Sequence, residues 1–388
     1  MSNHTLITNH LIKFVRDLYQ TNDFIPLHSP LFVGQESEYV AQTISSTFVS
    51  SVGFFVDRFE ESMATLTGSN RAIAVVNGTA ALQVGLHLVD VKKGDLVITQ
   101  ALSFVATCNA ISHCGAQPVF CDVDLSTMGL SPESVALWLF ENAYIDDVGK
   151  ARRSSDDARI QACVPMHTFG HPIRIHELQQ ICQKWGITIV EDAAESVGSL
   201  YQGQHTGTFG QVGIQSFNGN KIITTGGGGM ILTDEWKGAQ AKHLTTTAKV
   251  AHAWNFDHDA VAWNFRMPNL NAALGLAQLE QLGLFLKVKR HIFDSYTAAL
   301  SNIIEIQREP KHCISNFWLN AVICEDKNMR DVVLRETNAA GVMTRPIWTL
   351  LSQLPMYSNC DSGPLDVSQW LADRVVNVPS GVTEGMSK

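Results

Sequence analysis

The sequence contains no long apolar run, no CxxC pair of cysteines and no cluster of basic residues. Its longest apolar stretch, Ala272 to Leu286, is interrupted by Gln278, Glu280 and Gln281. It therefore falls short of the ~18 apolar residues that a membrane span needs. The N-terminal segment is too polar for a secretory signal peptide. These absences favour a cytoplasmic protein with no membrane partner.

The eight cysteines are scattered, which favours reduced, buried thiols over disulfides. A net charge of −9 without any basic run argues against a nucleic-acid partner. His167, His171 and His176 lie close together in the sequence. Gly170 and Pro172 would break any helix that aligned them, and no cysteine or carboxylate completes a ligand set, so we expect no metal site. Hydrolysis by a serine triad is disfavoured because no GxSxG turn is present.

With 388 residues, of which 45% are hydrophobic and 17% charged, the chain is long enough for two domains with a large core. Between about residues 60 and 235, short β-branched runs alternate with helical stretches. This alternation is typical of an α/β fold with a mostly parallel sheet and crossover helices. The seven predicted strands are Ala72–Val76, Asp95–Thr99, Gln117–Phe120, Ala162–Met166, Thr188–Val190, Gly213–Phe217 and Gly229–Leu232.

Helices are predicted between these strands at Thr79–Leu88, Phe104–His113 and Ile175–Trp185. The charged segment Asp146–Asp157 is interpreted as a surface loop or insertion. After Pro268, apolar residues recur at helical spacing, which predicts a helix that continues towards Arg290. We place an N-terminal arm and a large domain in residues 1–260, and a smaller C-terminal α/β domain in residues 261–388.

Asp192 ends the predicted strand run Ile187–Asp192. Ligands of open α/β sheets bind at the carboxyl ends of the strands, so a carboxylate at this position can face a site. The alternative interpretation is an aspartate that caps the next helix. In the functional interpretation, Asp192 pairs with a protonated ring nitrogen of a bound cofactor.

Lys221 follows the predicted strand Gly213–Phe217 and precedes a run of four glycines, Gly226 to Gly229. A lone lysine is usually a solvated surface charge. This one stands in a segment with few other charges, where desolvation would favour the neutral amine that forms Schiff bases. No GK[ST] follows the glycine run, which is therefore not a P-loop. We interpret it as a place of close backbone approach.

The segment Asn77–Leu82 follows a predicted strand and opens a helix. Backbone N–H groups at that helix start, at Gly78, Thr79 and Ala80, together with the Thr79 hydroxyl, would bind a phosphate. A plain N-cap is the alternative. Ser216 can add a second hydroxyl. Phe104 follows another strand end, where an aromatic ring either stacks on a cofactor or packs in the core.

Five motifs stand in the order typical of one family: NGTAALQ, SFVATCNAI, EDAAES, the lysine motif SFNGNK followed by TTGGGGM, and WNFRM. With them the chain resembles the DegT–DnrJ–StrS sugar aminotransferases, which are pyridoxal 5'-phosphate (PLP) enzymes. The resemblance extends from Pro26 to about Pro379. It implies an aspartate-aminotransferase-like fold, with a large mostly parallel seven-stranded sheet domain and a smaller C-terminal domain.

The resemblance also implies roles for individual residues. Lys221 resembles the Schiff-base lysine, which also shuttles protons during transamination, and Asp192 resembles the partner of the pyridine nitrogen. Phe104 matches the aromatic residue that covers the ring. Asn264 matches an asparagine that reaches the phosphate from a neighbouring subunit, which implies a homodimer with shared active sites. The positions that match the family's phosphate site are Gly78, Thr79 and Ser216.

One position departs from the family pattern. Many members have His or Gln three residues after the aspartate, near the cofactor's ring hydroxyl, where this chain has Glu195. The N-terminal segment from Pro26, the EDAAES variant and Thr344–Trp348 resemble a narrower branch. That branch uses UDP-linked 4-keto-6-deoxy amino sugars and aminates them at C4 on the way to legionaminic-type surface glycans.

The resemblance thus implies that glutamate donates an amino group to a nucleotide sugar for polysaccharide or lipopolysaccharide synthesis. Arg345 and His205 are candidates for contacts with the sugar and diphosphate; each is otherwise a routine surface residue. Four alternatives stay open: a GDP-perosamine-type synthase, a PLP-binding regulatory protein without turnover, a dehydratase of the same family, and a nicotinamide-dependent oxidoreductase. Lys221 argues against the dehydratase, in which histidine replaces it. The missing GxGxxG argues against the oxidoreductase.

Overall fold

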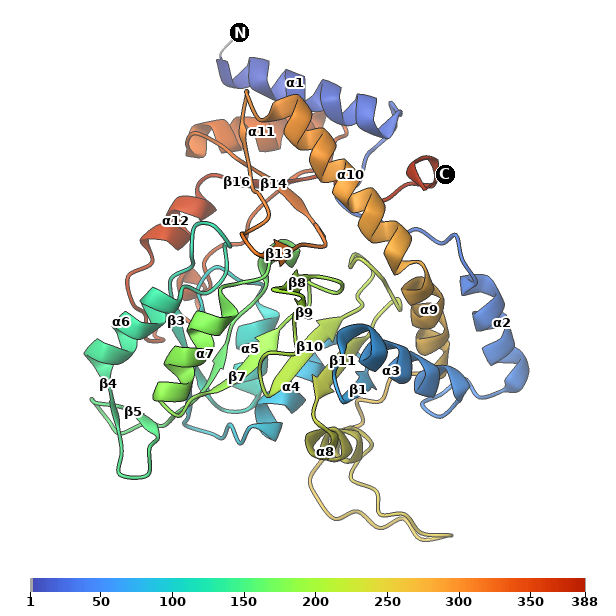
Figure 1. The fold of residues 1–388 in the computed structure, drawn as a ribbon, viewed down its shortest axis with the longest axis vertical. Coiled ribbons are helices and arrows are strands. Elements are labelled where there is room, and N and C mark those ends of the chain that lie inside the picture. Colours follow the sequence, from blue (N-terminus) through green and yellow to red (C-terminus); the bar gives the residue numbers. More distant parts are fainter. Residues whose placement is uncertain (1–2, 388) are drawn as a thin grey trace.

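The computed structural model describes residues 3–387, and its largest element is a seven-stranded sheet in the order β1-β11-β10-β7-β6-β2-β3 (Figure 1). Strand β11 is antiparallel to β1 and β10, whereas the other neighbouring strands are parallel. Each of the seven predicted strands is confirmed within two or three residues. The strands are β1 Arg71–Val75, β2 Leu96–Gln100, β3 Gln117–Cys121, β6 Ile160–Val164, β7 Thr188–Asp192, β10 Val212–Ser216 and β11 Gly229–Thr233.

Helices cover both faces of this sheet. Successive residues of a strand point to opposite faces, so each strand has side chains in the packing on both sides. Val97 packs in a core cluster with residues of α4, α5 and α8, whereas Ile98 packs in a second cluster with residues of α6 and α7. Fully buried strands need apolar residues on both sides, which explains their nearly continuous β-branched runs. The helices are α4 Gly78–Leu88, α5 Ala106–His113, α6 Pro132–Asn142, α7 Ile175–Lys184 and α8 Glu235–Thr245.

A smaller antiparallel sheet, in the order β12-β14-β16-β15, forms the other end of the molecule together with α10, α11 and α12 (Figure 1). The N-terminal helix α1 (Asn3–Tyr19) lies at this end and packs on α10 and α11, far along the chain. The remaining bounds are β12 Glu305–Ile306, β14 Asn320–Ile323, β15 Arg345–Pro346, β16 Val375–Val378, α11 Lys327–Ala339 and α12 Asp366–Ala372. The boundary at residue 260 stays a prediction.

Three local predictions differ from the structure. The helix predicted from Leu270 towards Arg290 is interrupted at Gln281, giving α9 (Asn269–Glu280) and α10 (Leu282–Leu300). Helix α5 begins at Ala106, so that Phe104 stays in the preceding loop. The charged segment predicted as a surface loop or insertion contains β5 (Ala151–Arg153), which pairs with β4 (Ala143–Ile145) in a hairpin.

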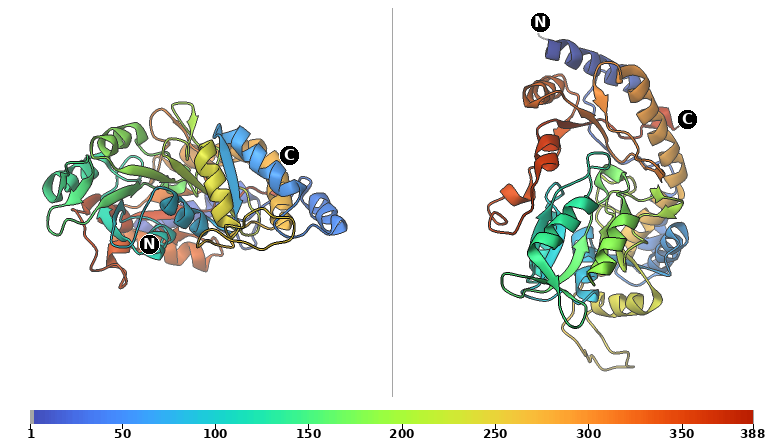
Figure 2. Two further views of the ribbon diagram at one scale, coloured as in Figure 1. Left: turned by 90° about the horizontal axis from the view of Figure 1, so that it is seen from below. Right: turned by 60° about the vertical axis from the view of Figure 1, so that its left-hand side comes forward.

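Helices α2 (Glu36–Ser46) and α3 (Phe54–Thr67) pack on α9 beside β1. Between α8 and α9, the first part of residues 246–268 forms a loop that extends past α8, as the right-hand view of Figure 2 shows, and the chain then returns to the large sheet, where Arg266 pairs with Val75 of β1. A three-stranded sheet joins β13 (Cys313–Ile314) to the hairpin of β8 (Leu200–Tyr201) and β9 (Gln204–His205). Across residues 3–387, no helix combines the length and apolarity that crossing a bilayer requires.

Candidate active site

A cavity of about 250 Å³ lies at the carboxyl ends of β7 and β10, next to the start of α4. Seven of the nine site residues proposed from the sequence line it. The first and the last of them lie more than 140 positions apart in the sequence. Those residues are Gly78, Thr79, Phe104, Asp192, Glu195, Ser216 and Lys221. Their convergence is the geometry expected when strand ends and a helix start meet at one sheet edge.

Lys221 lies in a turn after β10, where its N–H is donated to the Asn218 carbonyl. Its side chain is 13% exposed, and its Nζ is 3.2 Å from Glu195 Oε1. The same nitrogen is 3.9 Å from the centroid of the Trp318 ring. The sequence predicted a desolvated amine but not this buried carboxylate beside it.

Asp192 is the last residue of β7 and is 3% exposed. Its carboxylate accepts hydrogen bonds from Thr107 Oγ1 at 2.6 Å and from the Ala194 N–H at 3.2 Å. Burial raises the pKa of Asp192, although these two hydrogen bonds and the charge of Lys221 oppose the rise. Within residues 3–387, Asp192 forms no ion pair of 4 Å or less. It is therefore a buried carboxylate without a basic partner, which is the arrangement that a cationic ligand would complete.

The start of α4 lies close to the cavity and to the strand end that carries Ser216. The Asn77 side chain caps the helix by accepting the Ala80 N–H at 2.8 Å. In the part of the chain that the structure describes, the N–H groups of Gly78 and Thr79 have no acceptor. A Cβ on Gly78 would lie 3.0 Å from Ser216 Cβ, and one on Gly229 would lie 2.5 Å from the Asn77 carbonyl. The predicted close approach of the glycine run is therefore confirmed at Gly229.

The other predicted site residues lie at the edge of the cavity or outside it. Ala80 does not line the cavity, and its N–H is already donated to Asn77, so a role in ligand binding stays a prediction. Phe104 lines the cavity edge and is 51% exposed. Asn264 lies outside the cavity, in the extended segment before α9, where its side-chain oxygen accepts a hydrogen bond from Arg266 Nε.

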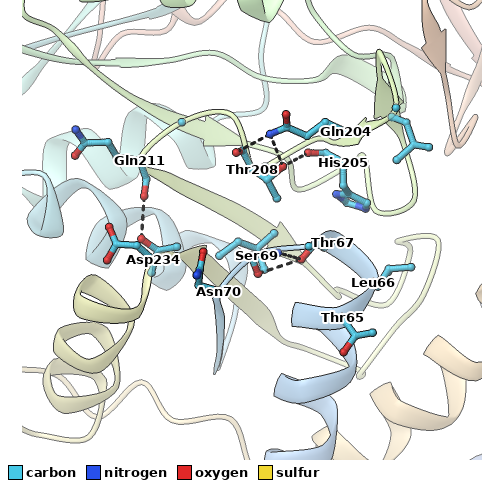
Figure 3. A pocket seen from close by; sticks show the side chains of 17 residues that line it. Thr65, Leu66, Thr67, Ser69, Asn70, Gln204, His205, Thr208, Gln211 and Asp234 are labelled. Atoms are coloured by element: carbon cyan, nitrogen blue, oxygen red, sulfur yellow. Dashed lines mark hydrogen bonds between the residues drawn. The ribbon is translucent and has the colours of Figure 1, made fainter.

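His205 and Arg345 are not beside Lys221. His205 lines a second pocket between α3 and the β8–β9 hairpin, shown in Figure 3. It is 3% exposed rather than a surface residue, and burial lowers its pKa to about 4. Its ring nitrogens contact the Thr206 carbonyl and the Gly198 N–H. Arg345 lies in the exposed strand β15 and donates to the carbonyl of neighbouring Thr344.

Three contributors to the cavity were not assigned from the sequence. Trp318 and Trp348 line it from the C-terminal part of the chain. Thr107 fixes the Asp192 carboxylate from the first turn of α5. A threonine that follows a strand end was a usable signal for Thr107, whereas nothing near Trp318 in the sequence relates it to Lys221, 97 positions away.

The geometry agrees with what comparison with known proteins finds. A model of the DegT/DnrJ/EryC1/StrS aminotransferase family matches residues 32–386. The GDP-perosamine synthase of Escherichia coli O157:H7 is 32% identical over 359 residues, covering 92% of this chain and 93% of that protein. EpsN of Bacillus subtilis (strain 168), which carries the name of a pyridoxal phosphate-dependent aminotransferase, is 34% identical over 366 residues, covering 92% and 91%.

Among solved structures, the aminotransferase TlmJ from Streptoalloteichus hindustanus superposes with a TM-score of 0.84. It is 26% identical and the alignment covers 94% of this chain and 96% of TlmJ. The residues that the family model matches, 32–386, include both sheets and every segment that lines the cavity.

Proposed function

Because this chain belongs to the DegT/DnrJ/EryC1/StrS aminotransferase family, we propose that it transfers an amino group from glutamate to a 4-keto-6-deoxy nucleotide sugar, with Lys221 as the residue that carries the cofactor. The cofactor of this enzyme is pyridoxal phosphate. The observation that carries the proposal is the convergence of Lys221, Asp192 and the start of α4 on one cavity.

The residues around the cavity fit pyridoxal phosphate. The buried Asp192 carboxylate, which lacks a basic partner within residues 3–387, suits a protonated pyridine nitrogen. The N–H groups of Gly78 and Thr79 and the Ser216 hydroxyl suit its phosphate, because a helix start favours anions. When bound, the cofactor supplies an aldehyde that condenses with amines and a cationic ring that withdraws electrons.

The chain's own groups then have distinct tasks. Asp192 would keep a proton on the pyridine nitrogen, and Thr107 fixes the carboxylate that would do so. The Lys221 amine would take a proton from the donor carbon as a general base and return it to another carbon as a general acid. Phe104, Trp318 and Trp348 limit access of water to the cavity.

The first test is the half-reaction with the amino donor. We expect the holoenzyme, mixed with L-glutamate and no sugar, to yield pyridoxamine phosphate and 2-oxoglutarate in equal amounts, because each transfer of the amino group consumes one bound aldehyde. Loss of the visible absorbance and quantification of 2-oxoglutarate measure this. A protein that binds the cofactor for regulation alone would give no 2-oxoglutarate, and that result would reject the proposal.

The second test concerns the acceptor. The branch that the N-terminal segment resembles uses UDP-linked 4-keto-6-deoxy amino sugars, so we expect the UDP-linked substrate to have the highest kcat/KM in a panel of UDP-, GDP- and TDP-linked keto sugars. A GDP-linked keto sugar is the second candidate, since GDP-perosamine synthases are among the relatives. Turnover of the GDP-linked sugar alone would establish the second candidate and exclude the first.

We also propose that the active enzyme is a homodimer with shared sites. Exposed apolar side chains gather on two segments, one that leads into the start of α3 and one between α8 and α9 (Phe48, Val52 and Phe54; Trp254, Phe256 and Val261). Val261 is 97% exposed. Large exposed apolar surfaces of this kind are typical of protein interfaces. Because Asn264 lies on the second segment and outside its own cavity, a partner's cavity is the site that it would reach.

Subunit complementation tests this sharing. Lys221→Ala and Asn264→Ala should each be nearly inactive as homodimers. If Asn264 acts on the partner's cavity, a mixed dimer combines the intact lysine of one chain with the intact asparagine of the other, and one of its two sites is complete. Refolding equal amounts together should then restore roughly a quarter of wild-type activity, since half of the dimers are mixed. No recovery, with mixed dimers shown by mass spectrometry, would contradict sharing.

A further inference from the structure

The Lys221 amine lies between two side chains that face it from different parts of the chain. Glu195, in the loop after β7, places its Oε1 at 3.2 Å from Nζ. Trp318, just before β14, places its ring at 3.9 Å from the same atom. A carboxylate and an indole face both stabilise a cation, the first by opposite charge and the second by its ring quadrupole. We refer to Glu195 and Trp318 together as the lysine clamp.

Hydrogen bonds connect the two halves of the lysine clamp. Asn316 Nδ2 donates to the Glu195 carbonyl at 2.9 Å, and Asn316 Oδ1 accepts the Trp318 N–H at 2.8 Å. The other carboxylate oxygen of Glu195 accepts the Phe169 N–H at 2.9 Å. The indole N–H of Trp318 is donated to the Asn220 carbonyl, next to the lysine. Glu195 and Trp318 are therefore held in place by bonds other than those to Lys221.

Three titratable groups act on the Lys221 amine. Glu195 is 3% exposed; burial raises its pKa, while Lys221 and the Phe169 N–H lower it. Asp192 interacts electrostatically with Lys221 but forms no ion pair with it. His28 is nearby, and burial, Lys289 and Lys221 hold its pKa well below the ordinary value, so it is neutral at physiological pH. Glu195 alone among these groups forms an ion pair with Lys221 within residues 3–387.

We propose that the lysine clamp holds the free amine of Lys221 as an ammonium group and so sets the pH at which Lys221 reacts with a carbonyl compound. The reaction itself needs the lone pair of the amine. The ammonium first releases one proton to solvent, the nitrogen–carbon bond then forms, and the carbonyl oxygen leaves as water. During turnover the same clamp stabilises the ammonium that results when Lys221 takes up a substrate proton, which makes Glu195 and Trp318 positioning residues for the proposed reaction.

The test measures the amine without its cofactor, so that it is independent of the proposed function. The full-length, cofactor-free protein is treated with limiting formaldehyde and cyanoborohydride from pH 6 to pH 11, and methylation of the Lys221 peptide is quantified by mass spectrometry. Glu195→Gln removes the negative charge but keeps the size of the side chain. We expect it to move the midpoint of Lys221 labelling down by about 1–2 pH units. Labelling at pH 7 should rise about ten- to a hundredfold, with an unchanged plateau at high pH.

A matched control and a second variant make the result specific. Glu60, whose side chain is largely buried, pairs with the more exposed Lys242 at 2.7 Å, and neither residue lines the cavity, so Glu60→Gln should leave Lys221 labelling unchanged. Trp318→Phe keeps an aromatic face with a weaker quadrupole and should shift the midpoint in the same direction by a smaller amount. A lower plateau without a moved midpoint, in either variant, would mean that the residue serves only the fold and would overturn the proposal.

The same shift should appear when pyridoxal phosphate is added. The rate of cofactor uptake by Glu195→Gln, followed by visible absorbance, should exceed the wild-type rate at pH 7 and equal it at high pH. If the wild-type protein takes up no cofactor, the proposed function fails while the labelling test of the lysine clamp still stands. If uptake is normal and neither profile moves, the lysine clamp fails and the proposed function stands.

Discussion

Replacing Lys221 by alanine should abolish the covalent attachment of the cofactor and lower the rate of the glutamate half-reaction by at least about 10⁴-fold. Lys221 provides the one amine among the described residues that line the cavity. Without it, neither the condensation with an aldehyde nor the proton transfer between carbons has a group to perform it. Stopped-flow absorbance of the reconstituted variant with glutamate measures the loss.

Lys221→Arg separates the charge of the lysine from its chemistry. The arginine keeps a positive charge beside Glu195, whereas alanine leaves that buried carboxylate unpaired, so the arginine variant should be the more stable of the two. Both should be inactive, because a guanidinium group does not condense with an aldehyde under these conditions. Glutamate turnover by either variant at a rate near that of the wild type would mean that the reactive amine lies elsewhere.

Asp192→Asn should lower the half-reaction rate by about 10³-fold, equivalent to about 4 kcal/mol of transition-state stabilisation. The asparagine oxygen can still accept the Ala194 N–H, and its amide nitrogen can donate to the Thr107 hydroxyl, but it carries no charge with which to keep a ring nitrogen protonated. Cofactor binding should weaken less than the rate, because the phosphate contacts remain. Titration with pyridoxal phosphate and single-turnover kinetics separate the two effects.

The same substitution should stabilise the cofactor-free protein. Burial raises the pKa of Asp192 above its ordinary value of 3.8. A carboxyl group with a raised pKa in the folded state stabilises the fold only below that ordinary value, and the contribution is lost as the pH rises through the raised pKa. At pH 7.5 the variant should therefore be more stable than the wild type, and the difference should shrink towards pH 4.

Urea unfolding of the cofactor-free proteins at both pH values checks this expectation. Asp95→Asn is the matched control, because Asp95 is also buried but is paired with Arg159 at 2.6 Å. Removing its charge breaks that pair and should destabilise the protein at pH 7.5. If Asp192→Asn destabilises the protein to the same extent, Asp192 is not a buried charge without a partner, and its proposed role loses support.

The large sheet was predictable because its information is local. Each strand is a short, mostly buried run that contains β-branched or other apolar residues, and Gly, Asn or Asp often follows its end. Asp192 lies at a strand end, the start of α4 follows another strand end, and Lys221 lies a few residues beyond a third. Because ligands of open sheets bind at the carboxyl ends of the strands, the sequence alone predicted that these residues lie at one edge of the sheet. The roles assigned to these residues still rest on chemistry that only experiments test.

The features that the sequence did not predict depend on contacts between distant segments. Trp318 reaches Lys221 because residues next to the smaller sheet and residues of the large one share a hydrophobic core cluster, which no local pattern encodes. The packing of α1 on α11 joins the two ends of the described chain in the same way. The helix break at Gln281 was missed because apolar residues continue at similar spacing through both helices. Glu195 was noticed as a departure, but its ion pair required coordinates.

Borohydride reduction of the loaded enzyme, followed by proteolysis and mass spectrometry, tests the central claim most directly. Reduction converts the link between lysine and cofactor into a stable secondary amine, and the modified residue is then identified by its peptide. We predict one modified peptide, containing Lys221, at a stoichiometry near one per chain. Modification of a different lysine, such as the buried Lys289, or no modification at all, would contradict the account.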